Sequence, residues 1–200
     1  MSASNLAKLT IKSILAGVLI ALAGILYVNC ENKYIGAFLF SLGLISVVFL
    51  EAKLYTGVIG YCNSKKSFAD AAWILLFNVF SAFLVGLLYK SGNGSISIME
   101  NIINRSPFRV FLESIGCGIC IYLSVELYKK SKSIFPLVLG VMAFILAGFT
   151  HCIAISFYIG ASELELIHFG YLLICIVGNS IGSLLIRFLQ LGGKFTDELH

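Results

Sequence analysis

Long apolar runs separated by short polar segments dominate this chain. Six runs are long enough to cross a bilayer, because a spanning helix needs about 20 predominantly apolar residues. They cover residues 9–28, 34–61, 71–89, 108–128, 134–159 and 166–191. The one long polar connection, residues 91–107, is expected to be a loop with a short helix at 98–103. The pattern predicts an all-α integral membrane protein with six transmembrane helices in a single transmembrane domain, residues 1–200.

Two of the six runs are interrupted near their middle. The second contains Glu51 and Lys53, and the fifth contains Gly148 followed by His151. Irregular backbone at membrane depth persists only where it is buried in protein or lines a wet cavity. We therefore predict that spans two and five are broken helices. An ionisable side chain at this depth points to a functional site, although His151 could instead only bond a neighbouring helix.

The two halves of the chain resemble each other. Residues 12–22, 42–43 and 77–82 match residues 113–123, 139–140 and 178–183, at offsets of 101, 97 and 101. Three spans per half is an odd number, so the halves must have opposite topology. We expect two inverted repeats, about 8–90 and 108–192. Inverted repeats with matched broken helices favour a solute site near the membrane midplane.

Composition and charge support a membrane protein and limit its function. Of the 200 residues, 59% are hydrophobic and only 12% are charged, whereas soluble domains carry about 25% charged residues. With the N-terminus inside, nine Lys and Arg residues flank the inner ends of the spans and four flank the outer ends, which favours cytoplasmic termini. The basic residues therefore set orientation and do not indicate nucleic-acid binding. No nucleophile–base pair or metal cluster stands out, so neither an enzyme nor a cofactor is expected.

Three short motifs resemble the formate/nitrite transporter family. They are Leu54-Tyr55-Thr56-Gly57, Gly148-Phe149-Thr150-His151-Cys152-Ile153-Ala154 and Gly178-Asn179-Ser180-Ile181-Gly182. The resemblance covers all six spans and implies an aquaporin-like fold, assembled as a homopentamer with one pore per protomer. It implies passage of small monovalent anions such as formate, nitrite, hydrosulfide, acetate or lactate. The expected location is the cell (inner) membrane, in contact with lipid.

The resemblance also implies roles for individual residues. His151 matches the central pore histidine, and Thr56 matches the threonine that faces it. The constriction residues are expected to be Leu54, Tyr55 and Phe144. Structural support for the breaks is expected from Gly57, Gly148, Asn78 and Asn179.

Four positions depart from the family pattern. Thr150 and Lys53 stand where the family usually has acidic residues, while Gly118 and Ile155 stand where it usually has asparagines. The scaffold carries over more securely than the usual substrate, so this chain is read as a divergent branch.

The pattern of titratable and charged groups predicts proton-linked passage of an anion. Histidine titrates near neutral pH, so His151 could share a proton with the passing anion. Lys53 and Lys132 could attract the anion, but Lys53 could instead form an ion pair with Glu51 or Glu126. Two other classes stay open, namely a channel for neutral solutes such as water, ammonia or a small amide, and a non-transporting membrane scaffold.

Overall fold

A computed structural model describes residues 3–90 and 93–192, and every regular element in these two segments is helical. The elements are α1 (Ala3–Val28), α2 (Lys33–Phe49), α3 (Tyr55–Val58), the 3-10 helix η1 (Ile59–Tyr61), α4 (Lys65–Tyr89), α5 (Asn93–Ile103), α6 (Pro107–Ser131), α7 (Phe135–Leu146), α8 (Cys152–Ala161) and α9 (Leu166–Gln190). The prediction of an all-helical protein is therefore confirmed.

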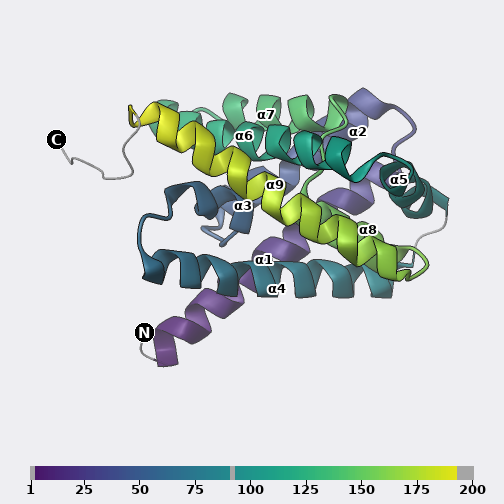
Figure 1. Ribbon diagram of the computed structural model, residues 1–200, viewed down its shortest axis with the longest axis horizontal. Helices are drawn as coiled ribbons and strands as arrows, with labels where there is room; N and C mark the ends of the chain where they lie inside the picture. The colour runs from purple at the N-terminus through teal and green to yellow at the C-terminus, as the bar shows by residue number, and fades with distance from the viewer. Residues whose placement is uncertain (1–2, 91–92, 193–200) are drawn as a thin grey trace.

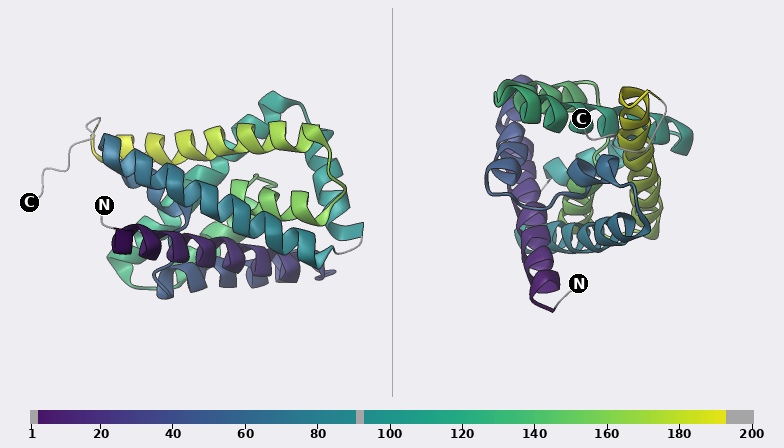
Figure 2. Two further views of the ribbon diagram at one scale, coloured as in Figure 1. Left: turned by 90° about the horizontal axis from the view of Figure 1, so that it is seen from below. Right: turned by 90° about the vertical axis from the view of Figure 1, so that its left-hand side faces the viewer.

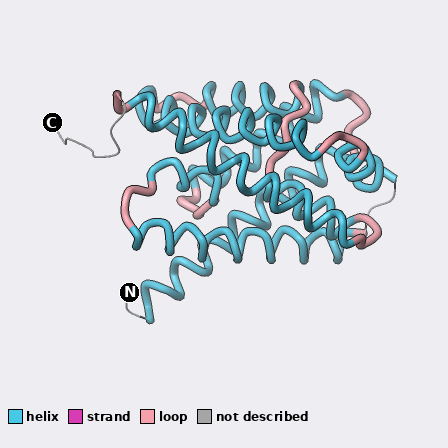
Figure 3. Tube along the Cα trace, in the orientation of Figure 1, coloured by secondary structure: helices cyan, strands magenta, loops and turns pink. Residues whose placement is uncertain are grey.

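Four helices, α1, α4, α6 and α9, are long and apolar enough to cross a membrane. Each has 25 or 26 residues, or about 38 Å at 1.5 Å per residue, which exceeds the thickness of a hydrocarbon core. The N-terminus of α1 and the C-terminus of α9 lie at the same end of the molecule, while α5 lies at the opposite end (Figure 1, Figure 3). The remaining apolar helices, α2, α7 and α8, have 10–17 residues.

The short helices α3 and α8 lie in the middle of the molecule. Viewed along the long axis, the longer helices surround them (Figure 2). All ten residues of α8 are buried, and Tyr55 and Thr56 of α3 are buried as well. A helix that is apolar all round has no polar face for solvent, so the centre of a bundle is the environment that suits it.

Some helices begin before the ranges predicted from the apolar runs, because a hydrogen-bonded cap or packing extends the helix into a polar segment. Helix α4 begins six residues before the apolar run, because Ser64 caps it and Ser67 completes a reciprocal capping box. The polar connection is more helical than expected, since α5 begins at Asn93 and not at residue 98. Met99 and Ile102 of α5 are almost fully buried, so packing against the bundle stabilises this amphipathic segment.

Both predicted interruptions have irregular backbone, at residues 50–54 and 147–151. Glu51 and Gly148 occupy equivalent places in them, with φ of 51° and 75°. This left-handed region suits glycine and is strained for glutamate. Gly57 was expected to support the first interruption. It lies inside α3 with its nearest potential Cβ contact at 3.9 Å, so packing does not require a glycine there.

Candidate functional site

Two buried asparagines hold the two interruptions in the same way. Asn78 on α4 donates to the carbonyls of Ser13 and Lys53 at 2.7 and 2.9 Å, and its Oδ1 accepts from Tyr55 N–H at 2.8 Å. The Lys53 carbonyl inside the interruption and the first N–H of the following short helix are thereby satisfied, as irregular backbone away from water requires.

Asn179 on α9 repeats this arrangement in the second half. It donates to the carbonyls of Ser114 and Thr150 at 2.8 and 2.9 Å, and its Oδ1 accepts from Cys152 N–H at 2.9 Å. Both asparagine side chains are fully buried. Asn78 and Asn179 therefore make equivalent sets of three hydrogen bonds, one set at each interruption.

Small residues let the supporting helices approach the asparagines closely. A Cβ added to Gly118 on α6 would collide with the carbonyl oxygen of Asn179, and Gly17 on α1 stands against Asn78 in the same way. Gly118 is one of the positions where the family usually has asparagine. In this chain the close approach of α6 and α9 leaves no space for that side chain.

The interruptions bring Thr56 and His151 into contact at the centre of the molecule. Thr56 Oγ1 and His151 Nε2 are 2.9 Å apart, and the two residues are 1% and 3% exposed. His151 is the residue before α8, and Leu54 occupies the equivalent place before α3. The histidine is thus displayed by non-helical backbone, facing the first turn of α3.

The second imidazole nitrogen reveals the tautomer. His151 Nδ1 accepts a hydrogen bond from Ala154 N–H at 3.2 Å, as an N-cap side chain of α8. A backbone N–H can only donate, so Nδ1 carries no proton in this geometry. The proton of a neutral imidazole must then be on Nε2, which donates to Thr56 Oγ1.

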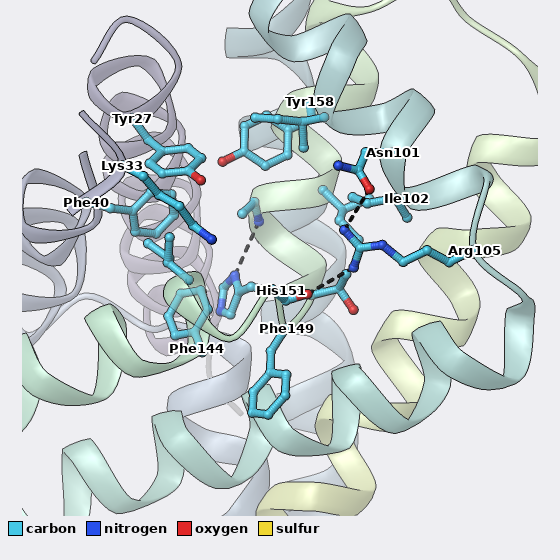
Figure 4. A pocket seen from close by; sticks show the side chains of 16 residues that line it. Tyr27, Lys33, Phe40, Asn101, Ile102, Arg105, Phe144, Phe149, His151 and Tyr158 are labelled. Carbon is cyan, nitrogen blue, oxygen red and sulfur yellow. Dashed lines mark hydrogen bonds between the residues drawn. The ribbon is translucent and has the colours of Figure 1, made fainter. Parts of the chain in front are cut away.

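A cavity of about 330 Å³, the His151 cavity, lies on the α5 side of the histidine. Its lining includes His151, Phe144, Ile155, Tyr158 and residues of α5 (Figure 4). The ring of Phe144 stacks on the imidazole, with centroids 5.8 Å apart and planes at 24°. Phe40 packs edge-on against Phe144 at 6.0 Å, so aromatic rings narrow the space next to the histidine.

A second cavity of about 430 Å³, the Lys53 cavity, lies against α3 and the first interruption, residues 50–54. Its lining includes Leu54, Lys53, Gly57, Tyr61 and Lys129. Leu54, which lines this cavity, is only 2% exposed and precedes Thr56 by two residues. His151 lines the first cavity, and Leu54 and Gly57, the residues near Thr56 in sequence, line the second.

Lys53 does not form either expected ion pair. Within the described segments Glu51 pairs with Lys12 at 3.0 Å and Glu126 pairs with Lys130 at 3.3 Å, and no carboxylate lies within 4.0 Å of the Lys53 ammonium. Lys53 instead lines its cavity.

Two other predicted residues lie away from the cavities. The Tyr55 hydroxyl is 2.7 Å from Ser180 Oγ on α9, and Tyr55 lines neither cavity. Its place as first residue of α3 turns its side chain toward α9, so the structure does not bring it to the constriction. Lys132 is exposed after α6 with φ of 57°, and it lines neither cavity. Lys129, one turn earlier, lies over the Tyr61 ring at 3.4 Å and lines the Lys53 cavity in its place.

Sequence reasoning missed two cations that line the His151 cavity, Lys33 and Arg105. Lys33 Nζ donates to the Leu146 carbonyl at 3.3 Å. Arg105 donates to the Gly148 carbonyl at 3.0 Å and to Glu113 at 2.6 Å. Both were counted only as outer charges that set orientation. Their contacts with the end of α7 and the interruption after it arise from the tertiary fold, so no local signal could reveal them.

The structure shows the surroundings of Thr150 and Ile155, two positions that depart from the family pattern. The Thr150 hydroxyl is 2.6 Å from Ser114 Oγ, and both side chains are buried. The Thr150 hydroxyl therefore has a hydrogen-bond partner on α6, and it places no negative charge next to the imidazole, as an acidic residue would. Ile155 lines the His151 cavity, one turn from the histidine, where it offers no hydrogen bond.

Solved structures share this fold. One is described as a pentameric formate channel with formate bound, with a TM-score of 0.82 at 19% identity over 96% of this chain and 98% of that chain. Another, described as an FNT family ion channel, has a TM-score of 0.85 at 19% identity over 96% and 91%. With its apolar helices, the chain is a multi-pass helical membrane protein built on the fold of these channels.

The family follows from sequence. A model of the formate/nitrite transporter family matches residues 2–190, so this chain belongs to the formate/nitrite transporter family, as the motifs predicted. Relatives include the formate channel FocA of Haemophilus influenzae, 26% identical over 177 residues. The formate channel FocA of Escherichia coli K12 is 29% identical over 183 residues. The matches cover 72% and 74% of this chain but only 62% and 63% of those relatives.

Proposed function

We propose that this protein is a channel or permease for small monovalent anions, of the formate and nitrite class. The observation that carries the proposal is the buried Thr56–His151 contact of 2.9 Å; His151 lines one cavity, and Leu54 and Gly57 beside Thr56 in sequence line the other. Family membership and formate channels among the relatives support it. In this proposal the anion moves between the Lys53 cavity and the His151 cavity, past Leu54 on one side and Phe144 on the other.

The proposed membrane arrangement has six crossings. Helices α2 and α3 form one interrupted span and α7 with α8 forms another, in two inverted repeats over about 8–90 and 108–192. The matched hydrogen bonds of Asn78 and Asn179 support this pairing. Both termini would be cytoplasmic, in the cell (inner) membrane, so that α5 and the His151 cavity face outward.

We further propose a homopentamer surrounded by lipid. The fold neighbour described as a pentameric formate channel supports this assembly. Exposed large apolar side chains on the long helices, such as Leu88 at 79% and Leu166 at 88%, suit contact with lipid or a neighbouring protomer.

In the proposed mechanism His151 acts first as a fixed hydrogen-bond donor. Its Nε2–H is oriented by the Ala154 N–H on Nδ1, and Thr56 offers a hydroxyl that can rotate toward the anion. These donors replace part of the hydration that the anion loses, which otherwise costs several kcal/mol. Lys53 and Lys129 supply positive potential on the other side of Leu54.

Proton-linked passage requires one further step. A proton would bind Nδ1 and displace the Ala154 N–H, at the cost of an N-cap bond worth about 1 kcal/mol. The resulting imidazolium could transfer its Nε2 proton to the anion, which would cross as the neutral acid. The imidazole would then be left protonated on Nδ1 and would have to exchange tautomers before the next cycle. Proton transfer to the anion therefore requires that the hydrogen bond from Ala154 N–H to His151 Nδ1 first breaks.

A proteoliposome experiment tests the proposal. Formate, nitrite, hydrosulfide, acetate, lactate and chloride are offered with and without a pH gradient. His151→Phe is expected to lower uptake at least tenfold and to abolish its pH dependence, because it removes the imidazole of the central pair. His168→Phe is the matched control, since His168 is also buried, at 4% exposure, but lines neither cavity. Unchanged flux and pH dependence in His151→Phe would remove the histidine from the mechanism, and no flux of any anion would overturn the function.

A channel for water, ammonia or a small amide is the second candidate. The apolar Ile155 in the cavity wall and the neutral Nε2–H tautomer of His151 favour it. This alternative predicts solute flux that does not respond to membrane potential or proton gradient, whereas flux of an anion responds to both.

A further inference from the structure

Two tyrosine hydroxyls face the His151 cavity without a hydrogen-bond partner. Tyr158 of α8 and Tyr27 of α1 both line this cavity, and Figure 4 shows their hydroxyls directed toward one another, away from the imidazole. Tyr158 is 6% exposed. Within residues 3–90 and 93–192 neither hydroxyl has a partner. Neither hydroxyl oxygen is among the fully buried, unpartnered side-chain atoms of these two segments, so both hydroxyls are accessible from the cavity and can donate to an occupant.

The tyrosines and the histidine are separated along one wall. His151, Ile155 and Tyr158 are spaced i, i+4 and i+7, which places them on one face of α8. Seven residues at 1.5 Å rise correspond to about 10 Å along the axis. Ile155 lies between them on this face and offers no polar atom. The tyrosine hydroxyls are therefore polar groups of the cavity that are separate from the imidazole.

The charge near the tyrosines is positive. Lys33 and Arg105 are the charged residues that line this cavity, and no carboxylate lines it. Arg105 is already bound to Glu113 at 2.6 Å. Among the described residues Lys33 has no carboxylate within 4.0 Å, and its ammonium has room for more acceptors than the Leu146 carbonyl. Figure 4 shows the Lys33 side chain extending into the cavity between Tyr27 and His151.

We infer that Tyr27, Tyr158 and Lys33 form a second anion-binding site in the His151 cavity, on the tyrosine side of the imidazole. The site takes a small monovalent anion with at least two acceptor atoms, such as formate or nitrite, because two hydroxyls and an ammonium converge on it. Here the anion exchanges water for fixed donors before it moves on to Thr56 and His151. The inference rests on the proposed function, since it assumes that anions use this cavity.

The test measures formate uptake by the full chain in proteoliposomes, with formate added on the α5 side. Tyr158→Phe is expected to raise the half-saturating formate concentration about tenfold, as expected for losing a hydrogen bond to a charged ligand. The maximal rate should stay within about twofold, because the central pair is unchanged. Tyr27→Phe should act in the same direction. Lys33→Gln should do so at low salt and less at high salt, where screening is strong.

Tyr34→Phe is the matched control, because Tyr34 is 68% exposed and lines neither cavity. It should leave half-saturation from the α5 side unchanged. Wild-type transport with unchanged half-saturation in Tyr158→Phe, Tyr27→Phe and the double variant would overturn the second site. A lowered maximal rate at an unchanged half-saturating concentration would also overturn it, since the hydroxyls would then affect passage of the anion through the centre and not its binding. If the wild-type protein passes no anion, the proposed function itself fails.

Discussion

Replacing Asn179 with alanine should destabilise the protein by about 3 kcal/mol. The variant leaves Cys152 N–H buried without an acceptor, which costs about 1–3 kcal/mol. The two carbonyls lose a donor each but keep others, since Thr150 O also accepts from Cys175 Sγ at 3.1 Å and Ser114 lies within α6. Each of these losses is worth about 0.6 kcal/mol by the average for hydrogen bonds between membrane helices.

The free energy of unfolding can be measured by titrating detergent-solubilised protein with sodium dodecyl sulfate. The fluorescence of Trp73, the single tryptophan of the chain, and helical circular dichroism report the transition. Ser156→Ala is the matched control, because Ser156 is equally buried but makes one bond, to the Cys152 carbonyl of its own helix at 2.8 Å. That variant should lose less than about 1 kcal/mol. Asn78→Ala should match Asn179→Ala, since its three bonds are equivalent.

The reasoning is refuted if Asn179→Ala is no less stable than Ser156→Ala. Such a result would mean that water or a shifted backbone satisfies Cys152 N–H and that the asparagine does not hold the interruption. A large loss in Asn179→Ala beside no loss in Asn78→Ala would refute the equivalence of the two halves while leaving the local argument intact.

Two further predictions concern helix packing and charge. Gly118→Ala should lower the yield of folded protein sharply, because its Cβ would collide with the Asn179 carbonyl; size-exclusion chromatography checks this, with Gly170→Ala, which has open space, as the control expected to behave like wild type. Lys53→Gln should reduce formate uptake several-fold at low ionic strength and much less at high salt, because Lys53 lines its cavity without an ion pair. Equal effects at both salt concentrations would show that Lys53 acts by packing and not by its field.

Local signals in the sequence predicted the interruptions but not their details. Charges at Glu51 and Lys53 and the glycine at Gly148 disturb otherwise apolar runs, and the structure has non-helical backbone at both places. The first residue of α4 was not predicted, because the capping box at Ser64 and Ser67 extends the helix into a charged segment. Hydropathy does not report such caps, since they act through one or two hydrogen bonds.

Residue placement at the candidate site was predicted in part. The contact between Thr56 and His151 joins residues 95 positions apart, and the family resemblance anticipated it. The resemblance did not anticipate that Tyr55 turns to Ser180 or that Lys129 and not Lys132 lines the Lys53 cavity. Side-chain direction depends on where each short helix begins, and a shift of one residue rotates it by about 100°.

The sequence by itself determined that the chain is helical and belongs in a membrane, because long apolar runs have no other stable environment and must satisfy their backbone internally. It also determined where those runs break and which histidine lies at a break. Only the tertiary structure decided which groups meet there. The asparagines that hold the breaks, the Nδ1 contact that selects the tautomer, and the tyrosines and Lys33 around the His151 cavity come from helices distant in sequence. Their contacts depend on how α1, α2, α4, α8 and α9 pack, and no local pattern encodes that geometry.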